Sequence, residues 1–240
     1  MPLPQITTPT YELVLPSTGK KIKYRPFLVK EEKILILALE SEDQKQITEA
    51  VKNTLKSCII TKGIKVDDLP TFDIEYIFLN IRGKSVGESV DLIVTCPDDG
   101  KTTVPVKVYI DEIQVQKQKD HNLDIKLDDF YTLRMKYPSL DQFIETNFVV
   151  ADQKIGLDDS FDMIASCIDM VFSEEESWAS TDCTKKELNQ FLEQLNSKQF
   201  KEIENFFVTM PKLSHTVKVT NPNTEVESEV TLEGITSFFE

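Results

Sequence analysis

Three pairs of short alternating segments, each joined by a turn that contains proline, constrain the fold of this 240-residue chain most. The turns read Pro-Ser-Thr-Gly, Pro-Asp-Asp-Gly and Asn-Pro-Asn-Thr, and the pairs occupy residues 11–27, 90–110 and 215–232. An apolar residue at every second position gives a strand one buried face, and proline, glycine, asparagine and aspartate favour turns. Each pair therefore predicts an antiparallel β-hairpin.

Segments with helical spacing follow the first hairpin. Residues 28–40 are so densely apolar that we expect this helix to be buried on most sides. Ser41 stands three residues before Gln44, the spacing of a capping box, and predicts the start of a second helix that continues to Ile59. A third helix is expected from Thr71 to Arg82, with too many apolar residues for one stripe and with Gly83 placed to end it.

The second half of the sequence mixes both periods. Alternation predicts a strand pair at residues 122–127 and 130–136, and Ser139 with Gln142 predicts a capped helix. An amphipathic helix is expected over residues 161–172, followed by an exposed acidic loop over residues 173–183. Two further helices follow, the first capped by Thr184 and Glu187 and the last stopped by Pro211.

These elements predict an α+β fold, a helical body with three or more antiparallel β-hairpins, N-terminal, central and C-terminal. Four segments follow along the chain, and they are expected to pack as one or two domains. They are a hairpin with a helical unit (1–84), a central β region (85–137), a second helical unit (138–212), and a hairpin with an apolar tail (213–240). The second and third hairpins both enter their turns through Val-Thr-x-Pro, which indicates either an internal duplication or a chance match.

Charge and composition exclude several classes of protein. The chain has 27 lysine and arginine residues against 41 aspartate and glutamate residues, a net charge of -14, and residues 1–65 alone carry +4. Nucleic acid is not expected as a partner, because phosphate neutralisation needs a dominant basic face. A membrane is not expected either, since the sequence has neither a spanning apolar run nor a signal peptide. An even number of cysteines permits disulfides, but free, buried thiols are the expectation for Cys58, Cys96, Cys167 and Cys183.

No motif in the sequence assembles a catalytic site, a metal site or a cofactor site. The two histidines are far apart and no C-x-x-C pair occurs, so structural zinc is not expected. Gly83-Lys-Ser resembles the end of a P-loop, but Phe78 stands where the first glycine is required. We expect no catalytic residue and no enzyme activity, with a carboxylate-based enzyme as the remoter alternative.

Candidate partner-binding residues fall into three groups. A cluster of basic residues could dock a partner or could be the solvated edge of a strand: Lys20, Lys21, Lys23, Arg25 and Lys30. Trp178 could anchor an interface or cover the end of a helix. Ile235, Phe238 and Phe239 could insert into a partner groove or pack against the body of the protein.

The N-terminal sequence also resembles a known family. The segments Tyr11-Glu-Leu-Val-Leu-Pro-Ser-Thr-Gly-Lys and Arg25-Pro-Phe-Leu-Val-Lys-Glu-Glu-Lys33 are similar to the T4-like bacteriophage baseplate protein family, as are Leu69-Pro-Thr-Phe-Asp and Glu233-Gly-Ile-Thr-Ser-Phe-Phe.

This resemblance implies a late viral protein without enzyme activity or cofactor. Such a protein promotes assembly of the baseplate hub in the host cytoplasm as an assembly chaperone; alternatively, it is a structural subunit retained in the hub of the virion. Its expected partners are other baseplate hub proteins. The sequence leaves the oligomeric state open.

Overall fold

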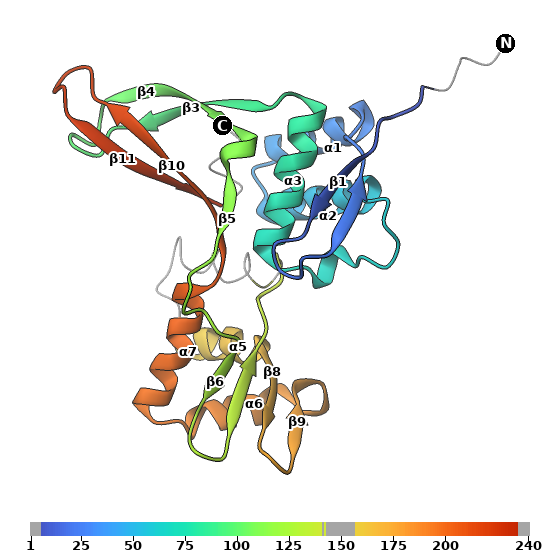
Figure 1. Ribbon diagram of the computed structural model, residues 1–240, viewed down its shortest axis with the longest axis vertical. Helices are drawn as coiled ribbons and strands as arrows, with labels where there is room; N and C mark the ends of the chain where they lie inside the picture. Colours follow the sequence, from blue (N-terminus) through green and yellow to red (C-terminus); the bar gives the residue numbers. More distant parts are fainter. Residues whose placement is uncertain (1–5, 141, 143–156, 235–240) are drawn as a thin grey trace. The chain divides into compact units, whose positions relative to one another are not determined.

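The computed structural model describes residues 6–140, 142 and 157–234 (Figure 1). Over these residues the chain forms helices and small antiparallel sheets, which confirms the predicted α+β fold. The contacts group the chain into two units, Met1–Gln116 with Lys212–Glu240, and Lys117–Pro211. The predicted division of the sequence into four segments stays a prediction.

The second unit is an insertion in the first. Strand β5 (Gln114–Gln116) precedes the insertion and strand β10 (Lys212–Thr220) follows it, and the two strands pair antiparallel with Gln116 opposite Lys212. The chain therefore enters and leaves the second unit through neighbouring strands.

From residue 6 onward, the N-terminal part of the first unit forms one hairpin and three helices. Their bounds are β1 (Tyr11–Val14), β2 (Lys21–Tyr24), α1 (Val29–Glu40), α2 (Gln44–Cys58) and α3 (Thr71–Ser85). Short 3-10 turns lie at Val66–Asp68 in this part, and at Ile110–Glu112 and Ser180–Asp182 further along the chain. The turn of the hairpin is tied to α3, because the backbone N–H of Ser17 donates to the buried Asp73 carboxylate at 3.0 Å and its hydroxyl donates to the other carboxylate oxygen.

Two predictions about helix ends are wrong. The N-cap of α2 is Asp43, whose carboxylate accepts from the N–H groups of Lys45 and Gln46, whereas Ser41 caps the C-terminus of α1. The carboxylate directly before the first turn of α2 already accepts from two N–H groups of that turn. A capping box that starts at Ser41 is therefore not needed there. Gly83 does not end α3 but lies inside it, where a Cβ atom would stand 3.1 Å from Ile110 Cδ1.

Helix α1 differs from its prediction in burial rather than in position. Only Glu31, Leu35 and Ala38 are buried, and they form one narrow stripe. The other large apolar side chains of α1 are exposed, so the expected burial on most sides is wrong. The sequence pattern reports the hydrophobicity of a helix but not the presence of a neighbour on each side of it.

Two hairpins share one core in the first unit and lie side by side (Figure 1). They are β3 (Ser89–Thr95) with β4 (Thr103–Tyr109), and β10 with β11 (Glu227–Glu233), as the alternation predicts. Their inward residues pack together with Leu79 of α3: Val90, Leu92, Val94, Val108, Leu213, Val217 and Val219. The two turns are also joined, because the buried Asn221 amide donates to both carboxylate oxygens of Asp98 at 3.1 and 3.0 Å.

All three predicted hairpins have the same turn geometry. In each, a buried residue before proline accepts through its carbonyl from the N–H four positions later, at 2.8 to 3.0 Å. The donor has a positive φ of 61 to 69°, and the pairs are Gly19 to Leu15, Gly100 to Cys96 and Glu225 to Asn221. Proline presets the first turn residue, and a left-handed residue closes the turn.

The elements with bounds in the described part of the second unit are one sheet and the helices that pack with it. The sheet order is β6 (Asp124–Lys126), β7 (Thr132–Met135), β8 (Ile168–Phe172) and β9 (Ser177–Ala179), and the helices are α5 (Leu157–Ser166), α6 (Lys185–Glu193) and α7 (Ser197–Thr209). Their core includes Leu133, Ile164, Cys167, Ile168, Leu192, Ile203 and Phe206. The strand pair predicted within residues 122–136, the Thr184–Glu187 capping box and the helix that ends before Pro211 are confirmed.

The helix predicted over residues 161–172 is a helix in its first half and a strand in its second half. Helix α5 ends at Ser166, and Ile168, Val171 and Phe172 lie on β8, which pairs with β9. β-branched and aromatic residues favour a strand, and a short apolar run does not separate the two structures. The glutamates at 174–176 therefore lie in a hairpin turn, not in a long acidic loop. Ser139 and Gln142 exchange the predicted capping bonds, and residues 143 and 144 of that helix lie outside the described residues.

Candidate interaction surfaces

Among the elements whose side-chain exposure is described, helix α1 presents the largest group of exposed apolar side chains. Val29 is 78% exposed, and Ile34, Ile36, Leu37 and Leu39 are between 41% and 55% exposed. We call these five residues the α1 face. Single exposed apolar residues are ordinary, whereas groups of exposed apolar side chains are typical of interaction surfaces, so the α1 face is a candidate.

An ion pair fixes the first turn of α1. The carboxylate of Glu31 accepts from Arg25 Nη2 at 3.0 Å and from the backbone N–H of Leu28 at 2.8 Å, and Lys30 Nζ lies 3.4 Å away. Burial alone favours the neutral carboxyl group, but the hydrogen bonds from Arg25 and Leu28 outweigh it and lower the pKa of Glu31. Arg25 and Lys30 therefore neutralise a buried carboxylate at the start of α1.

The other predicted basic residues lie on β2 and the turn before it. Lys21 pairs with Glu12 at 2.8 Å, and Lys23 lies 3.6 Å from the same carboxylate. The hydrogen bond from Lys21 is the main cause that lowers the pKa of Glu12. Lys20 donates through its backbone N–H to Thr18. Four of the five basic residues thus have an acidic partner, Glu12 or Glu31, and the role of the cluster in docking stays a prediction.

Trp178 lies on the edge strand β9, opposite Val171, and is 41% exposed. Its ring centroid is 6.2 Å from that of Tyr131, which is 43% exposed, and the adjacent Phe130 is 76% exposed. Whether Trp178 anchors an interface or covers the end of a helix stays a prediction. The predicted tail residues Ile235, Phe238 and Phe239 lie outside the described residues.

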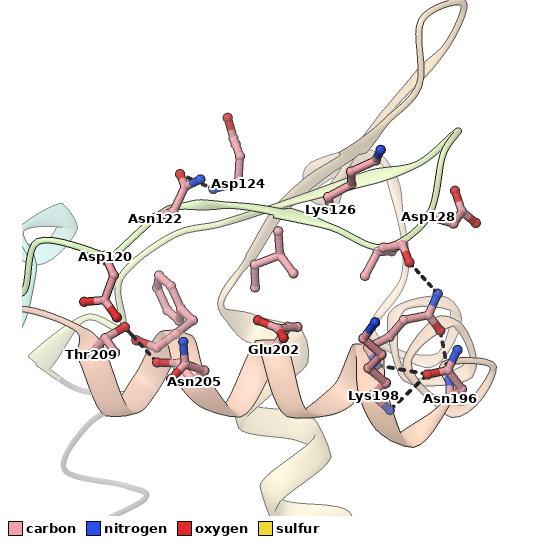
Figure 2. Close-up of a pocket in the computed structure, with 14 residues that line it drawn as sticks. Asp120, Asn122, Asp124, Lys126, Asp128, Asn196, Lys198, Glu202, Asn205 and Thr209 are labelled. Carbon is pink, nitrogen blue, oxygen red and sulfur yellow. Dashed lines mark hydrogen bonds between the residues drawn. The ribbon is translucent and has the colours of Figure 1, made fainter.

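A groove of about 640 Å³ lies in the second unit between β6 and α7 (Figure 2). Ile125, Leu127 and Phe206 line it with apolar side chains, and all the other lining side chains are polar: Asp120, Asn122, Asp124, Lys126, Asp128, Asn196, Lys198, Gln199, Glu202, Asn205 and Thr209. Hydrogen bonds cross it at both ends. Gln199 donates to the Leu127 carbonyl at 2.9 Å, and the His121 ring lies 2.9 Å from the Thr209 hydroxyl.

The two histidines take part in local contacts. The second ring nitrogen of His121 lies 3.0 Å from the Tyr137 hydroxyl, and burial lowers the pKa of this ring. His215 lies 3.9 Å from Glu112. Among the described residues, no group of three histidine, cysteine or acidic side chains is arranged to hold a metal ion. No helix in the described ranges is long and apolar enough to cross a membrane.

The sequence of this chain matches a known protein family. The sequence model of the family described as T4 bacteriophage base plate protein matches residues 8–240. The chain belongs to this family. Searches of curated proteins and of solved structures find no match. The resemblance seen in the N-terminal segments is thereby confirmed, and this phage baseplate protein associates with other baseplate proteins of the tail.

Two surfaces of this baseplate protein were missed by the sequence predictions. The α1 face was expected to be buried, and its signal was the density of apolar residues beyond what one stripe needs. The groove was not predicted because β6 and α7 are far apart in the sequence and its lining is mostly polar. Phe130 and Tyr131 beside Trp178 were also missed, although two adjacent aromatic residues after an Asp-Asp turn are a visible signal.

Proposed function

We propose that this baseplate protein promotes assembly of the baseplate hub through protein–protein contacts and without catalysis. The single observation that carries the proposal is the α1 face, five large apolar side chains exposed on one helix. Family membership supplies the setting, because other baseplate proteins are the partners available to such a surface.

The energetics of α1 favour a macromolecular partner. Complete burial of a leucine or isoleucine side chain contributes roughly 1.5 to 3 kcal/mol, so half-exposed side chains leave a substantial part of this free energy to be gained on binding. A helix that is apolar on all sides is typical of a protein core. Contact with an apolar surface of a hub protein would complete such a core around α1.

The attachment of α1 to its own unit supports this use. Glu31 is held by Arg25, Lys30 and the Leu28 N–H, while Leu35 and Ala38 are buried. The helix is therefore anchored along one stripe before a partner binds, which reduces the conformational entropy lost on binding.

The experiment is co-purification of the full-length chain with co-expressed baseplate hub proteins. Replacing Ile36 and Leu37 together by glutamine should reduce recovery of the hub complex at least tenfold, because the polar amides would be desolvated in the interface. The matched control is Lys33→Gln, another exposed position of α1, which should leave recovery unchanged. Equal recovery with the double variant and an unchanged melting temperature would contradict the proposal.

Mass spectrometry of purified virions separates assembly from retention. An assembly-promoting protein should be absent from the finished particle or present far below the amount of the hub subunits. A stoichiometric amount in the particle would instead establish the alternative, a structural subunit retained in the hub.

A further inference from the structure

Strand β6 is an edge of the four-stranded sheet, and its free side borders the groove (Figure 2). The Leu123 carbonyl accepts from the Met135 N–H at 2.8 Å, and the Leu127 N–H donates to the Tyr131 carbonyl at 3.0 Å. Alternate residues of a strand direct their backbone groups to opposite sides, so those of Asp124 and Lys126 point away from β7. The Asp124 N–H donates to the Asn122 side-chain oxygen at 3.1 Å, which leaves the Asp124 carbonyl and both backbone groups of Lys126 for an added strand. A chain lying beside β6 can therefore hydrogen-bond to this side.

Helix α7 forms the opposite wall of the groove. Its Ile203 and Phe206 side chains belong to the core, whereas Glu202 and Asn205 are exposed and lie on the side of the helix that lines the groove (Figure 2). The residues from Leu123 to Leu127 extend over roughly 15 Å at the rise of a strand. This length suits an added strand of about four residues.

The groove also selects by charge. Four acidic side chains line it against two lysines. Asp124 is already paired with Arg134, and Lys126 with Asp129, whereas Asp120 and Glu202 form no ion pair among the described residues. Lysine or arginine side chains of an incoming strand would find carboxylates at Asp120 and Glu202, and its apolar side chains would cover Ile125 and Leu127.

We propose that the groove beside β6 binds an extended basic segment of another baseplate protein, which adds as a fifth strand to the sheet. The Asp124 carbonyl and the N–H and carbonyl of Lys126 supply the strand pairing, and Asp120 with Glu202 supplies the charge selection. A second copy of the chain is disfavoured as the occupant, because two molecules of net charge -14 repel one another.

The test uses the full-length protein and a fluorescently labelled probe peptide, Lys-Val-Lys-Val-Lys-Val. Fluorescence anisotropy at low salt should show saturable binding, and the matched peptide Glu-Val-Glu-Val-Glu-Val should bind at least tenfold more weakly. Replacing Asp120 by asparagine and Glu202 by glutamine should weaken binding of the basic peptide at least fivefold. The control removes two charges at the turn between β8 and β9 instead, with Glu174→Gln and Glu175→Gln, and should change binding less than twofold.

Strand pairing has a test of its own. Lys126→Pro removes the N–H group that points away from β7, a position where an edge strand tolerates proline. It should abolish binding of the basic peptide, whereas Lys126→Ala, which keeps the N–H group, should bind as the wild type does. Amide NMR shifts caused by the peptide should be concentrated in β6 and α7, and a thermal melt of each variant checks that it is folded.

Three results would overturn this inference. The first is that folded Lys126→Pro and Lys126→Ala bind the basic peptide equally well, and the second is that the groove charge variant and the control charge variant weaken peptide binding equally. The third is self-association of the protein that Lys126→Pro abolishes, which would make a second copy the occupant. The inference rests on the proposed function only in assuming protein partners. The Ile36 and Leu37 double variant should bind the peptide normally. If the groove bound no peptide but recovery of the hub complex still depended on the α1 face, the proposed function would stay intact.

Discussion

Helices α1 and α3 are built from similar residues but have opposite environments. Both carry more large apolar side chains than one stripe can hold. In α3, Phe72, Ile74, Ile77, Phe78, Leu79 and Ile81 are each 3% exposed or less. In α1, only one narrow stripe is buried and the α1 face is open to solvent.

The difference teaches where each helix obtains its stabilisation. The first hairpin, through Ser17, and the 3-10 turn, through Ile110, both contact α3, and α3 supplies Leu79 to the core shared by the two later hairpins. The apolar surface of α3 is thus used within the chain. Under our proposal, the apolar surface of α1 is used between chains, so the same kind of sequence supports folding in one helix and binding in the other.

Truncating a buried side chain of α3 should have the largest effect on stability. Ile77 is 0% exposed, and Ile77→Ala should lower the free energy of unfolding by roughly 3 to 4 kcal/mol through lost burial and the remaining cavity. Urea unfolding followed by circular dichroism measures this change. A loss below about 1 kcal/mol would show that α3 is not the centre of the first unit.

Breaking the anchor of α1 should have the next largest effect. Arg25→Leu leaves the buried Glu31 carboxylate with Lys30 and the Leu28 N–H, and should cost roughly 2 to 3 kcal/mol. Since the pKa of Glu31 is lowered in the folded protein, its stabilisation is present above the unfolded pKa of about 4.3 and is lost as the pH falls through the folded pKa.

The pH dependence distinguishes this ion pair from simple packing. The difference in unfolding free energy between wild type and Arg25→Leu should be largest near neutral pH and should shrink as the pH falls below the unfolded pKa of Glu31. Urea unfolding at several pH values measures it. A difference that is constant with pH would assign the role of Arg25 to its apolar stem.

The contact at Gly83 should give a smaller, coupled effect. An added Cβ would stand 3.1 Å from Ile110 Cδ1, and Ile110→Val removes that atom. Gly83→Ala gains about 1 kcal/mol of helix propensity only if the Ile110 side chain can move away from the new methyl group. A double-mutant cycle should therefore show Gly83→Ala to be more favourable by about 1 kcal/mol in the Ile110→Val background. Additive effects would mean that Gly83 is tolerated in α3 without a packing requirement.

Local signals predicted much of this fold. The three hairpins follow from alternation and from turns in which proline precedes a left-handed residue, and Thr184 with Glu187 identifies the start of α6. These features depend on neighbours within a few residues. The pairing of β5 with β10 does not, because Gln116 and Lys212 come together only when the whole second unit lies between them.

The candidate sites were less predictable than the fold. Alternation and helical spacing do not say whether an apolar side chain has a neighbour, so Leu37 was expected in the core although it is 55% exposed. Conversely, Arg25 was grouped with surface lysines although its side chain is 18% exposed and paired with Glu31. The groove depends on β6 and α7 lying together, and sequence spacing alone does not place Glu202 across the groove from β6.

The smallest expected effect on stability is the sharpest test of the comparison. Leu37→Gln replaces a half-exposed side chain of the α1 face with a polar one of similar size, and should change the free energy of unfolding by no more than about 0.5 kcal/mol. Urea unfolding beside Ile77→Ala measures both helices under one condition. A loss above about 1.5 kcal/mol that depends on protein concentration would show that copies of the chain already bury the α1 face. An equal loss at every concentration would show that the chain itself covers this face in solution, and α1 would then be a core helix like α3.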